Sequence, residues 1–258
     1  MNRFFTAGVV IIAFCAIAVS QETASTPAAA STTTQFAVRK GMPYSATQTI
    51  TITKLGADKQ TTTQVSRSLL WRDAEGRTRQ EDINEIPTIG EQHMIHISDP
   101  VARVGYTWAD GNGVDKRANP VIVSHTPKSW QEVEIRPNSF STVKPRTLPT
   151  ADQMRSSDSN IKVQVPQPKV LNGTHVEGRL VTRVIPANTA GGQSIAVTSE
   201  KWTSPELQLT IYSVQDDPRT EKRVLELTNI ERSKPDPSLF QPPADRPKLD
   251  ADQSQPLN

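Results

Sequence analysis

Two of the four histidines lie close together, and they are the first residues that could hold a metal ion or perform acid–base chemistry. His93 and His96 are three residues apart in the stretch QHMIHISDP. On a strand, this odd spacing directs the two imidazoles to opposite faces, so they cannot share a metal ion without a bulge. The isoleucines between and after them and the Asp99-Pro100 stop favour a strand over a helix. We therefore expect sheet histidines and no metal site.

Neighbouring carboxylates could supply a general acid and base. They occur at Glu81, Asp82 and Glu85 and again at Asp216-Asp217. Glycosidases hold two such groups across a sugar cleft. Here we place both groups in turns, where an Asp side chain also hydrogen-bonds to its own backbone. We therefore expect no catalytic pair.

The motifs of nucleophilic and nucleotide-dependent enzymes are missing. The sequence has no Gly-x-Ser-x-Gly elbow, since Gly192-Gln193-Ser194 only begins the next apolar run, and it has no Gly-x-Gly-x-x-Gly or Walker loop. The sequence thus predicts a protein that is not an enzyme and that needs no cofactor.

The amino terminus predicts export. Arg3 precedes an apolar run from Phe4 to Val19, and Ala18-Val19-Ser20 is a small-x-small cleavage pattern, so residues 1–20 are expected to be a signal peptide. A retained membrane anchor is the alternative, but the run is shorter than a bilayer-spanning helix. We expect a periplasmic or extracellular protein without a transmembrane span after signal removal.

Cys15 is the sole cysteine and falls inside that signal. The mature chain would then contain no thiol, which excludes disulfides, thiolate zinc sites and cysteine nucleophiles. Phe14 occupies the position where lipoprotein signals have a small residue, which disfavours lipidation of Cys15.

The charge of the chain gives no reason to expect a nucleic-acid partner. The formal net charge is only +2 at pH 7. The densest basic group comprises Arg67, Arg72, Arg77 and Arg79. A solvated outer surface is the simplest interpretation, and contact with an acidic partner or lipid headgroups is the alternative.

A period of two residues dominates the apolar pattern. In YSATQTITIT, residues 44–53, the even positions are apolar apart from Gln48, and every odd position is Ser or Thr. This pattern indicates a half-buried strand with a hydroxyl-rich outer surface. Similar runs are Val65, Leu69 and Trp71; Val104, Tyr106 and Trp108; Val176, Leu180 and Val184; Ile195 and Val197; Leu207, Leu209 and Ile211; and Val224 to Ile230. Glycine-containing turns between many of them favour an antiparallel meander.

These patterns predict one domain. We expect a flexible lead-in at residues 21–41, a single antiparallel β domain at 42–245 with a Pro-rich excursion at about 126–160, and a disordered tail at 246–258. Two β subdomains are the alternative. Helices should be few and short, because even TADQMRSS at 150–157 has too few apolar positions for a core helix.

The stretch LLWRDAEGRTRQEDI, residues 69–83, is expected to be a corner of the sheet. Its turn residues Asp73-Ala74-Glu75-Gly76 separate two alternating runs. In this interpretation Leu69 and Trp71 face inward, whereas Arg77 and Arg79 cover the outside.

A sheet with one apolar face must bury that face against something. With few helices available, the choices are a second sheet, a closed barrel, or a strongly curved, half-open barrel whose concave face stays partly accessible. The half-open barrel would provide an apolar cleft for a ligand. Its expected lining is Ile50, Ile52, Leu69, Trp71, Tyr106, Trp108, Leu209 and Ile211.

Several stretches resemble known proteins. LLWRDAEGRTRQE, IHISDPVARVGYTW, VEGRLVTRVIP and the run from SEKWTSPELQL to PDPSLF resemble a family of uncharacterised, signal-bearing bacterial secreted proteins over residues 42–125 and 160–245. That resemblance implies no activity. In strand order and in the closing PDPSLFQPP, the chain also resembles the LolA-like and RseB-like lipoprotein carriers. This second likeness implies a bent antiparallel half-barrel with a cleft for acyl chains, although the sequence lacks clear helices to plug the concave side.

Four functions remain open from the sequence. The preferred one is an exported, non-enzymatic binding protein that holds an apolar ligand or a lipidated chain, such as a lipoprotein, in the concave face of its sheet. A structural or envelope-assembly protein would instead fill that face with its own residues or with an envelope partner. An RseB-like envelope sensor and an enzyme with a convergent pocket are the other two.

Overall fold

The computed structural model describes residues 35–56, 60–136, 160–187 and 192–251. The expected signal peptide and the stretch 150–157 therefore lie outside the described residues. Strands make up most of the described part, and η2 (Pro237–Phe240) is a single turn of 3-10 helix. No helix in the described ranges is long and apolar enough to cross a bilayer.

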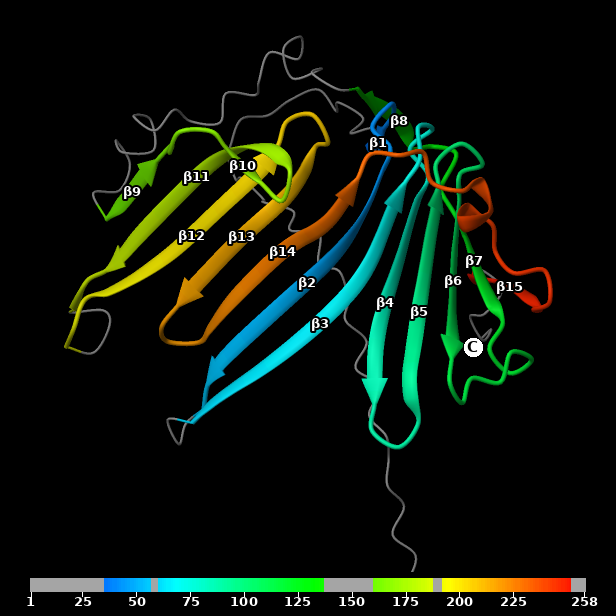
Figure 1. Cartoon of the computed structure of the whole chain (residues 1–258), viewed down its shortest axis with the longest axis horizontal. Helices are drawn as coiled ribbons and strands as arrows, with labels where there is room; N and C mark the ends of the chain where they lie inside the picture. Colours follow the sequence, from blue (N-terminus) through cyan, green and yellow to red (C-terminus); the bar gives the residue numbers. More distant parts are fainter. Residues whose placement is uncertain (1–34, 57–59, 137–159, 188–191, 252–258) are drawn as a thin grey trace, which may run out of the picture. The chain divides into compact units, whose positions relative to one another are not determined.

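Most of the strands belong to one sheet (Figure 1). The strands are β1 (Gln35–Arg39), β2 (Tyr44–Leu55), β3 (Thr61–Arg72), β4 (Thr78–Ile86), β5 (Gly90–Asp99), β6 (Val104–Gly111), β7 (Val121–His125), β8 (Gln131–Ile135), β9 (Ile161–Gln164), β10 (Lys169–Leu171), β11 (Thr174–Ile185), β12 (Ile195–Ser204), β13 (Leu209–Asp217), β14 (Glu221–Glu231) and β15 (Lys248–Asp250). The large sheet has the order β10-β11-β12-β13-β14-β2-β3-β4-β5-β6-β7-β15, with β9 also paired to β11.

This sheet is antiparallel apart from the β15–β7 pair, and it is not closed into a barrel. The expected mostly-β fold with an open antiparallel sheet is confirmed. Strands β1 and β8 form a separate parallel pair. Short turns join most neighbouring strands, because alternating sequences separated by turn residues pair with the strand that follows them.

The strand register defines two faces. Directly opposed residues in an antiparallel pair point to the same side, and successive residues point to opposite sides. We call face A the side that carries Leu69 and Trp71, and face B the side that carries Ile50 and Ile52. Thr47 is opposite Leu69, so Thr47 lies on face A. Ile50 is three residues further along β2, an odd number of positions, and therefore points to face B.

Two apolar clusters form the core. One consists of Ile95, Ile97, Trp108 and Val121, with Tyr106 packed beside it. The other is larger and gathers near the ends of β2, β13 and β14; its buried members are Tyr44, Ala46, Val176, Trp202, Leu207, Ile211 and Leu227. Burial of these side chains is the main force that holds the strands in one sheet.

The turn after β3 is a corner of the sheet, as expected. The Asp73 carboxylate is almost fully buried and accepts hydrogen bonds from the backbone N–H groups of Glu75 and Arg77. Gly76 has φ +87°, and a Cβ at this position would lie 2.7 Å from Cγ1 of Val38. The turn therefore requires glycine both for its backbone conformation and for the close approach of β1.

Both expected chain ends contain structure. Strand β1 lies within the expected lead-in, where Val38 is buried. Strand β15 lies within the expected tail, where the Arg246 side chain donates a hydrogen bond to the Ala109 carbonyl. Strand β8 likewise lies within the expected excursion. Flexibility was expected from composition, which does not reveal strands that pair with distant partners.

Candidate functional site

The expected ligand lining is divided between the two faces, and this corrects the sequence-based prediction of one cleft. Leu69, Trp71, Tyr106 and Trp108 share face A, because Trp71 pairs with Arg79, Arg79 with Ile97, and Ile97 with Tyr106. Ile50 and Ile52 lie on face B. Counting by alternation cannot relate two strands to each other, since a shift of one residue in their register exchanges the faces.

Leu209 and Ile211 lie beside the register shift that separates Trp202 from Thr203 in the β12–β13 pair. Ile211 is fully buried in the larger core cluster, and Leu209 packs against it. These two residues therefore serve as core and do not extend a row with the other six.

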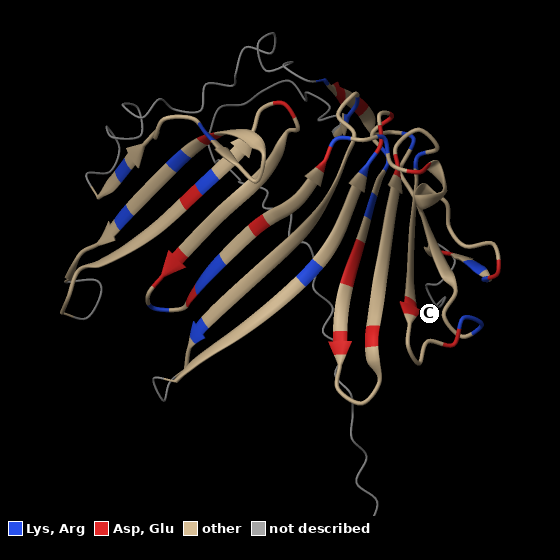
Figure 2. Ribbon diagram, viewed as in Figure 1, with Lys and Arg blue, Asp and Glu red and all other residues tan. Residues whose placement is uncertain are grey.

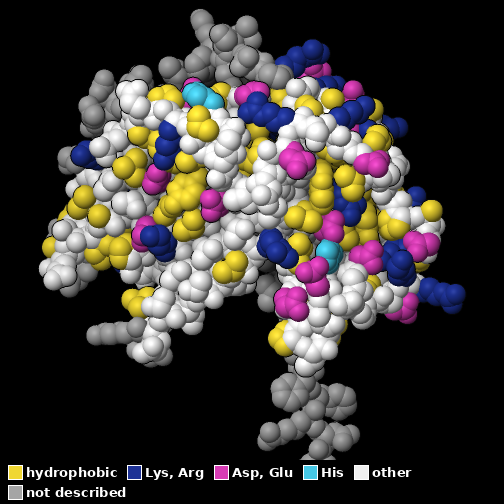
Figure 3. Space-filling model, in the orientation of Figure 1, with side chains coloured by type: hydrophobic (Ala, Val, Ile, Leu, Met, Phe, Trp, Pro, Cys, Tyr) yellow, Lys and Arg dark blue, Asp and Glu magenta, His cyan; other side chains and the backbone are white. Residues whose placement is uncertain are grey.

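The apolar part of face A over β5 and β6 is covered by the chain itself. Phe240 of η2 is completely buried, and η2 contacts β4 and β5. Trp108 is only 5% exposed. Figure 3 shows two areas of apolar side chains, one over β12 and β13 and one over β4 to β6, with mostly polar surface between them. The polar strip agrees with the threonines that β2 presents on face A.

Arg79 is part of this cover, which corrects its expected place on the outside. Its side chain is 14% exposed, and its guanidinium carbon lies 5.7 Å from the ring centroid of Trp71 and 5.5 Å from that of Trp108. The guanidinium also donates hydrogen bonds to the Glu81 carboxylate and to the Leu239 carbonyl. Arg79 therefore joins η2 to the sheet and is not a free surface charge.

His93 lies between two carboxylates on face A. Its Nδ1 is 2.5 Å from Oε1 of Glu81, and its Nε2 is 2.8 Å from Oε1 of Glu91. Burial alone would lower the pKa of His93, but the hydrogen bonds to these two carboxylates outweigh burial and raise it above its ordinary value of 6.5. With both ring nitrogens occupied, His93 has no free position for a substrate proton or a metal ion.

The expected opposition of His93 and His96 is confirmed by the register, which pairs His93 with Ile83 and His96 with Gln80. Within the described ranges, no group of three or more potential ligand side chains could hold a metal ion.

The neighbouring carboxylates were expected in turns, and the structure corrects this for the first group. Glu81, Asp82 and Glu85 lie within strand β4. In the second group, Asp217 is held by Arg219, whose hydrogen bonds lower the pKa of Asp217 to about 2.

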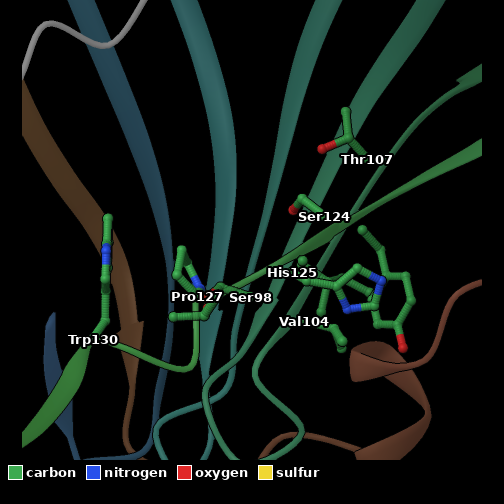
Figure 4. Close-up of a pocket in the computed structure, with 11 residues that line it drawn as sticks. Ser98, Val104, Thr107, Ser124, His125, Pro127 and Trp130 are labelled. Atoms are coloured by element: carbon green, nitrogen blue, oxygen red, sulfur yellow. The ribbon is translucent and has the colours of Figure 1, made fainter. Parts of the chain in front are cut away.

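A groove on face B is the strongest candidate for a ligand site. It has a volume of about 360 Å³ and lies over β5, β6 and β7. The segment from Thr126 to Trp130, which follows β7, lines it as well. Figure 4 shows the hydroxyl-bearing side chains of Thr107, Ser124 and Ser98 on the side of Trp130 and Pro127. The side chains of His125 and Val104 lie on the other side of the ribbon (Figure 4).

The floor of this groove depends on Gly105. A Cβ on Gly105 would lie 2.6 Å from Oγ of Ser124, so a larger residue would push into the hydroxyl that faces the groove. Arg103 fixes the wall, because its guanidinium donates hydrogen bonds to the carbonyls of Pro127 and Trp130. The groove is thus supported by residues on three neighbouring strands and on the segment that crosses them.

Apolar side chains adjoin the groove on the same face. Ile122 is opposite Thr107 and beside Leu249, and Met94 is opposite Ala109. Ile122 and Met94 are each 37% exposed, and Leu249 is 50% exposed. Together with the 38% exposed ring of Trp130, they give this face a hydroxyl-lined groove bordered by accessible apolar surface.

Sequence analysis missed this groove for an identifiable reason. Its wall comes from the Pro-rich excursion, where Pro127 and Trp130 have no periodic context. Its floor uses polar residues on strand faces that were expected to be solvated. The one available signal in the sequence was Trp130 itself, an aromatic residue outside the apolar pattern, because tryptophan is enriched at interfaces.

Comparison with known proteins gives distant likenesses in fold. No protein-family model matches the chain, and no curated protein sequence matches it. The solved structure of MucB is 12% identical with a TM-score of 0.38, and the match covers 80% of this chain but only 59% of that chain.

Two further solved structures match over most of their length. LprF from Mycobacterium bovis is 11% identical with a TM-score of 0.29, over 76% of this chain and 90% of that chain. A LolA superfamily protein from Nitrosomonas europaea is 10% identical with a TM-score of 0.31, over 80% of this chain and 93% of that chain. These values describe resemblance in fold and identify neither a ligand nor an activity.

Proposed function

We propose that this chain is an exported, non-enzymatic binding protein for an amphipathic ligand, such as a lipid or a lipidated chain. The observation that carries the proposal is the groove on face B, where hydroxyl groups and accessible apolar side chains adjoin each other. Ser98, Thr107 and Ser124 offer hydrogen bonds to a polar head. Ile122, Met94 and Leu249 offer apolar surface to an acyl chain.

The remaining features fit binding better than catalysis. His93 is already held by two carboxylates, and His125 lies on the opposite side of β7 from Ser124. A nucleophile and its base must lie within hydrogen-bond reach of each other. Export rests on the amino-terminal pattern of Arg3, the apolar run and the small-x-small site.

Occupation of the groove can be tested with a fluorescent fatty acid and the full chain. Ser124→Trp should fill the groove and reduce affinity for the probe about tenfold or more, because the acyl chain and the new ring would compete for one space. Ser66→Trp is the matched control, since Ser66 is an exposed face B residue on β3, away from the groove. Equal affinity in both variants would remove the groove as the ligand site.

A structural or envelope-assembly role is the second candidate. It is favoured by the cover over β5 and β6, where the chain fills an apolar face with its own Phe240. Native mass spectrometry of protein purified from its own envelope separates the two candidates. Co-purifying lipid supports the binding protein, and bare protein supports the structural role.

A further inference from the structure

Strands β4 to β7, which lie entirely within the described ranges, carry almost no charge on face B. By the register, the ionisable side chains that they present there are Asp82 and His96, and none of the four strands presents a lysine or an arginine on that face. Their other charged residues lie on face A, where Arg79 binds Glu81. Figure 2 shows the acidic bands on β4, β5 and β6. Asp82 is therefore the single carboxylate that these strands place on the face of the groove.

The Asp82 carboxylate is held by neutral groups. Its Oδ1 accepts hydrogen bonds from the Ser68 hydroxyl at 2.6 Å and from the Gln80 amide at 2.8 Å. Nε2 of His96 is 3.9 Å from Oδ2, which is too far for a hydrogen bond. In the part of the chain that the structure describes, no lysine or arginine lies within ion-pair distance of Asp82. The side chain is 35% exposed, so Oδ2 keeps the capacity to accept hydrogen bonds from a ligand.

A line of polar side chains connects Asp82 to the ligand groove. Thr107 lines the groove, and Nδ1 of the opposed His96 lies 3.1 Å from Oγ1 of Thr107. The other ring nitrogen of His96 is the atom that lies 3.9 Å from Asp82. Because neighbouring strands are about 4.8 Å apart, the backbones of Thr107 on β6 and Asp82 on β4 are roughly 12 Å apart along this diagonal. A polar head that begins among the groove hydroxyls can therefore extend over His96 to Asp82.

Building on the proposed function, we propose that Asp82 binds a primary ammonium group at the outer end of the ligand's head, so that the ligand is a lipid with an amine-bearing head. A carboxylate and an alkylammonium form charge-assisted hydrogen bonds, which are stronger than those between neutral groups. The ammonium has three N–H donors and no acceptor, which matches a carboxylate oxygen that only accepts. Met94 is directly opposite Asp82 and is 37% exposed, so apolar surface for the alkyl part of the ligand borders the anion.

A head that carries only negative charge fits this surface less well. It would meet hydroxyl groups but no cation on face B of β4 to β7, and Asp82 would repel it. Arg103 supports the groove wall but does not line the groove, because its guanidinium is bound to the carbonyls of Pro127 and Trp130 and lies 5.1 Å from the ring centroid of Phe36. A fatty acid can still occupy the groove, since its carboxylate would lie among the hydroxyls and away from Asp82.

Displacement of the fluorescent fatty acid from the full chain tests the ammonium site, with two lysophospholipids that share one acyl chain and stay below their micelle concentrations. Lysophosphatidylethanolamine, whose head ends in a primary ammonium, should bind about tenfold more tightly than lysophosphatidylglycerol, whose head ends in hydroxyls. Asp82→Asn keeps an acceptor for Ser68 and Gln80 but removes the charge, so it should reduce this preference to about twofold or less. Its affinity for the fluorescent fatty acid should not fall, which also shows that the variant is folded.

Glu85→Gln is the matched control, because it removes one negative charge from an exposed position of the same strand on face A. It should keep the full preference for lysophosphatidylethanolamine. Equal affinity of the unaltered chain for the two lysophospholipids, tighter binding of lysophosphatidylglycerol, a preference that persists in Asp82→Asn, or an equal loss in both variants would overturn the ammonium site. Each of these results leaves binding in the groove standing as long as the fatty acid binds. If neither the fatty acid nor a lysophospholipid binds, the proposed function fails, and the ammonium site fails with it.

Discussion

The imidazole Nδ1 of His93 lies 2.5 Å from Oε1 of Glu81 on neighbouring strands of face A. Burial alone would raise the pKa of Glu81, but its hydrogen bonds with His93 and Arg79 outweigh burial and lower it below 4.5. The pKa of His93 is raised by the same contact and by Glu91. Because Glu81 also binds Arg79, this contact connects a titrating histidine to the residue that holds η2.

The opposite shifts predict a pH window for stability. His93 stabilises the folded state fully below pH 6.5, and this contribution is lost as the pH rises through its raised pKa. Glu81 contributes fully above pH 4.5, and its contribution is lost as the pH falls through its lowered pKa. The pair should therefore contribute most between these two values. Urea unfolding over a pH series measures the free energy of unfolding.

His93→Gln should flatten the loss of stability above pH 6.5, because glutamine keeps hydrogen-bonding capacity without a titrating charge. Arg67, Glu91 and Asp110 also face this region, so the remaining pH dependence will not be zero. Gln92→Ala is the control on face B of the same strand, because Gln92 carries no titrating group, and it should keep the slope of the unaltered protein. Identical slopes for both variants would show that the His93 contact does not contribute.

Arg79→Lys should destabilise the protein although it preserves the charge. Lysine cannot place one planar group against Trp71 and Trp108 while it also bonds to Glu81 and to the Leu239 carbonyl. We expect a loss of about 1–3 kcal/mol in the free energy of unfolding. Arg67→Lys is the control, because the Arg67 side chain is 56% exposed and its single ion pair is long, with 3.7 Å between its guanidinium nitrogen and Oε2 of Glu91. It should change stability by less than about 0.5 kcal/mol.

The sequence predicted the fold because alternation is a local property. The threonines of YSATQTITIT and the turn at Asp73 to Gly76 each specify their own conformation without knowledge of the rest of the chain. The opposition of His93 and His96 follows from the same rule. An open antiparallel sheet could therefore be derived from residue types and turn positions.

The site could not be predicted in the same way. Whether Ile50 shares a face with Leu69 depends on the register between β2 and β3, which alternation within each strand leaves undetermined. The groove combines β5 to β7 with a crossing segment that carries Trp130, and such long-range contacts have no periodic signal. The contact of Arg79 with Trp71 and Trp108 was not predicted, because an arginine in an alternating sequence is indistinguishable from an ordinary polar surface residue.

The segment from Phe240 to Leu249 should contribute to stability, although a disordered tail was expected from residue 246 onward. Phe240 is completely buried against face A, so Phe240→Ala should cost about 3–5 kcal/mol in the free energy of unfolding. Leu249→Ala is the comparison within the same segment, because Leu249 is 50% exposed and should cost less than about 1 kcal/mol. Similar small losses in both variants would show that η2 is not part of the core.

Gly178 should be intolerant of a methyl group because of its neighbour across the β11–β12 ladder. A Cβ on Gly178 would lie 2.6 Å from Cζ3 of Trp202, 2.7 Å from its Cη2, and 2.8 Å from Cγ of Pro166. Trp202 is 4% exposed, and Nζ of Lys169 lies 3.8 Å from its ring centroid, so the indole has little room to move. Gly178→Ala should therefore lower the free energy of unfolding by about 1–3 kcal/mol.

A double-mutant cycle can separate steric overlap with Trp202 from the general cost of replacing a glycine. Trp202→Phe removes the part of the indole that the new methyl group would meet. If steric overlap is the cause, Gly178→Ala should cost clearly less in the Trp202→Phe background than in the unaltered chain, giving a coupling of about 1 kcal/mol. Additive losses would instead mean that Gly178 is needed for its backbone and not for the space beside Trp202.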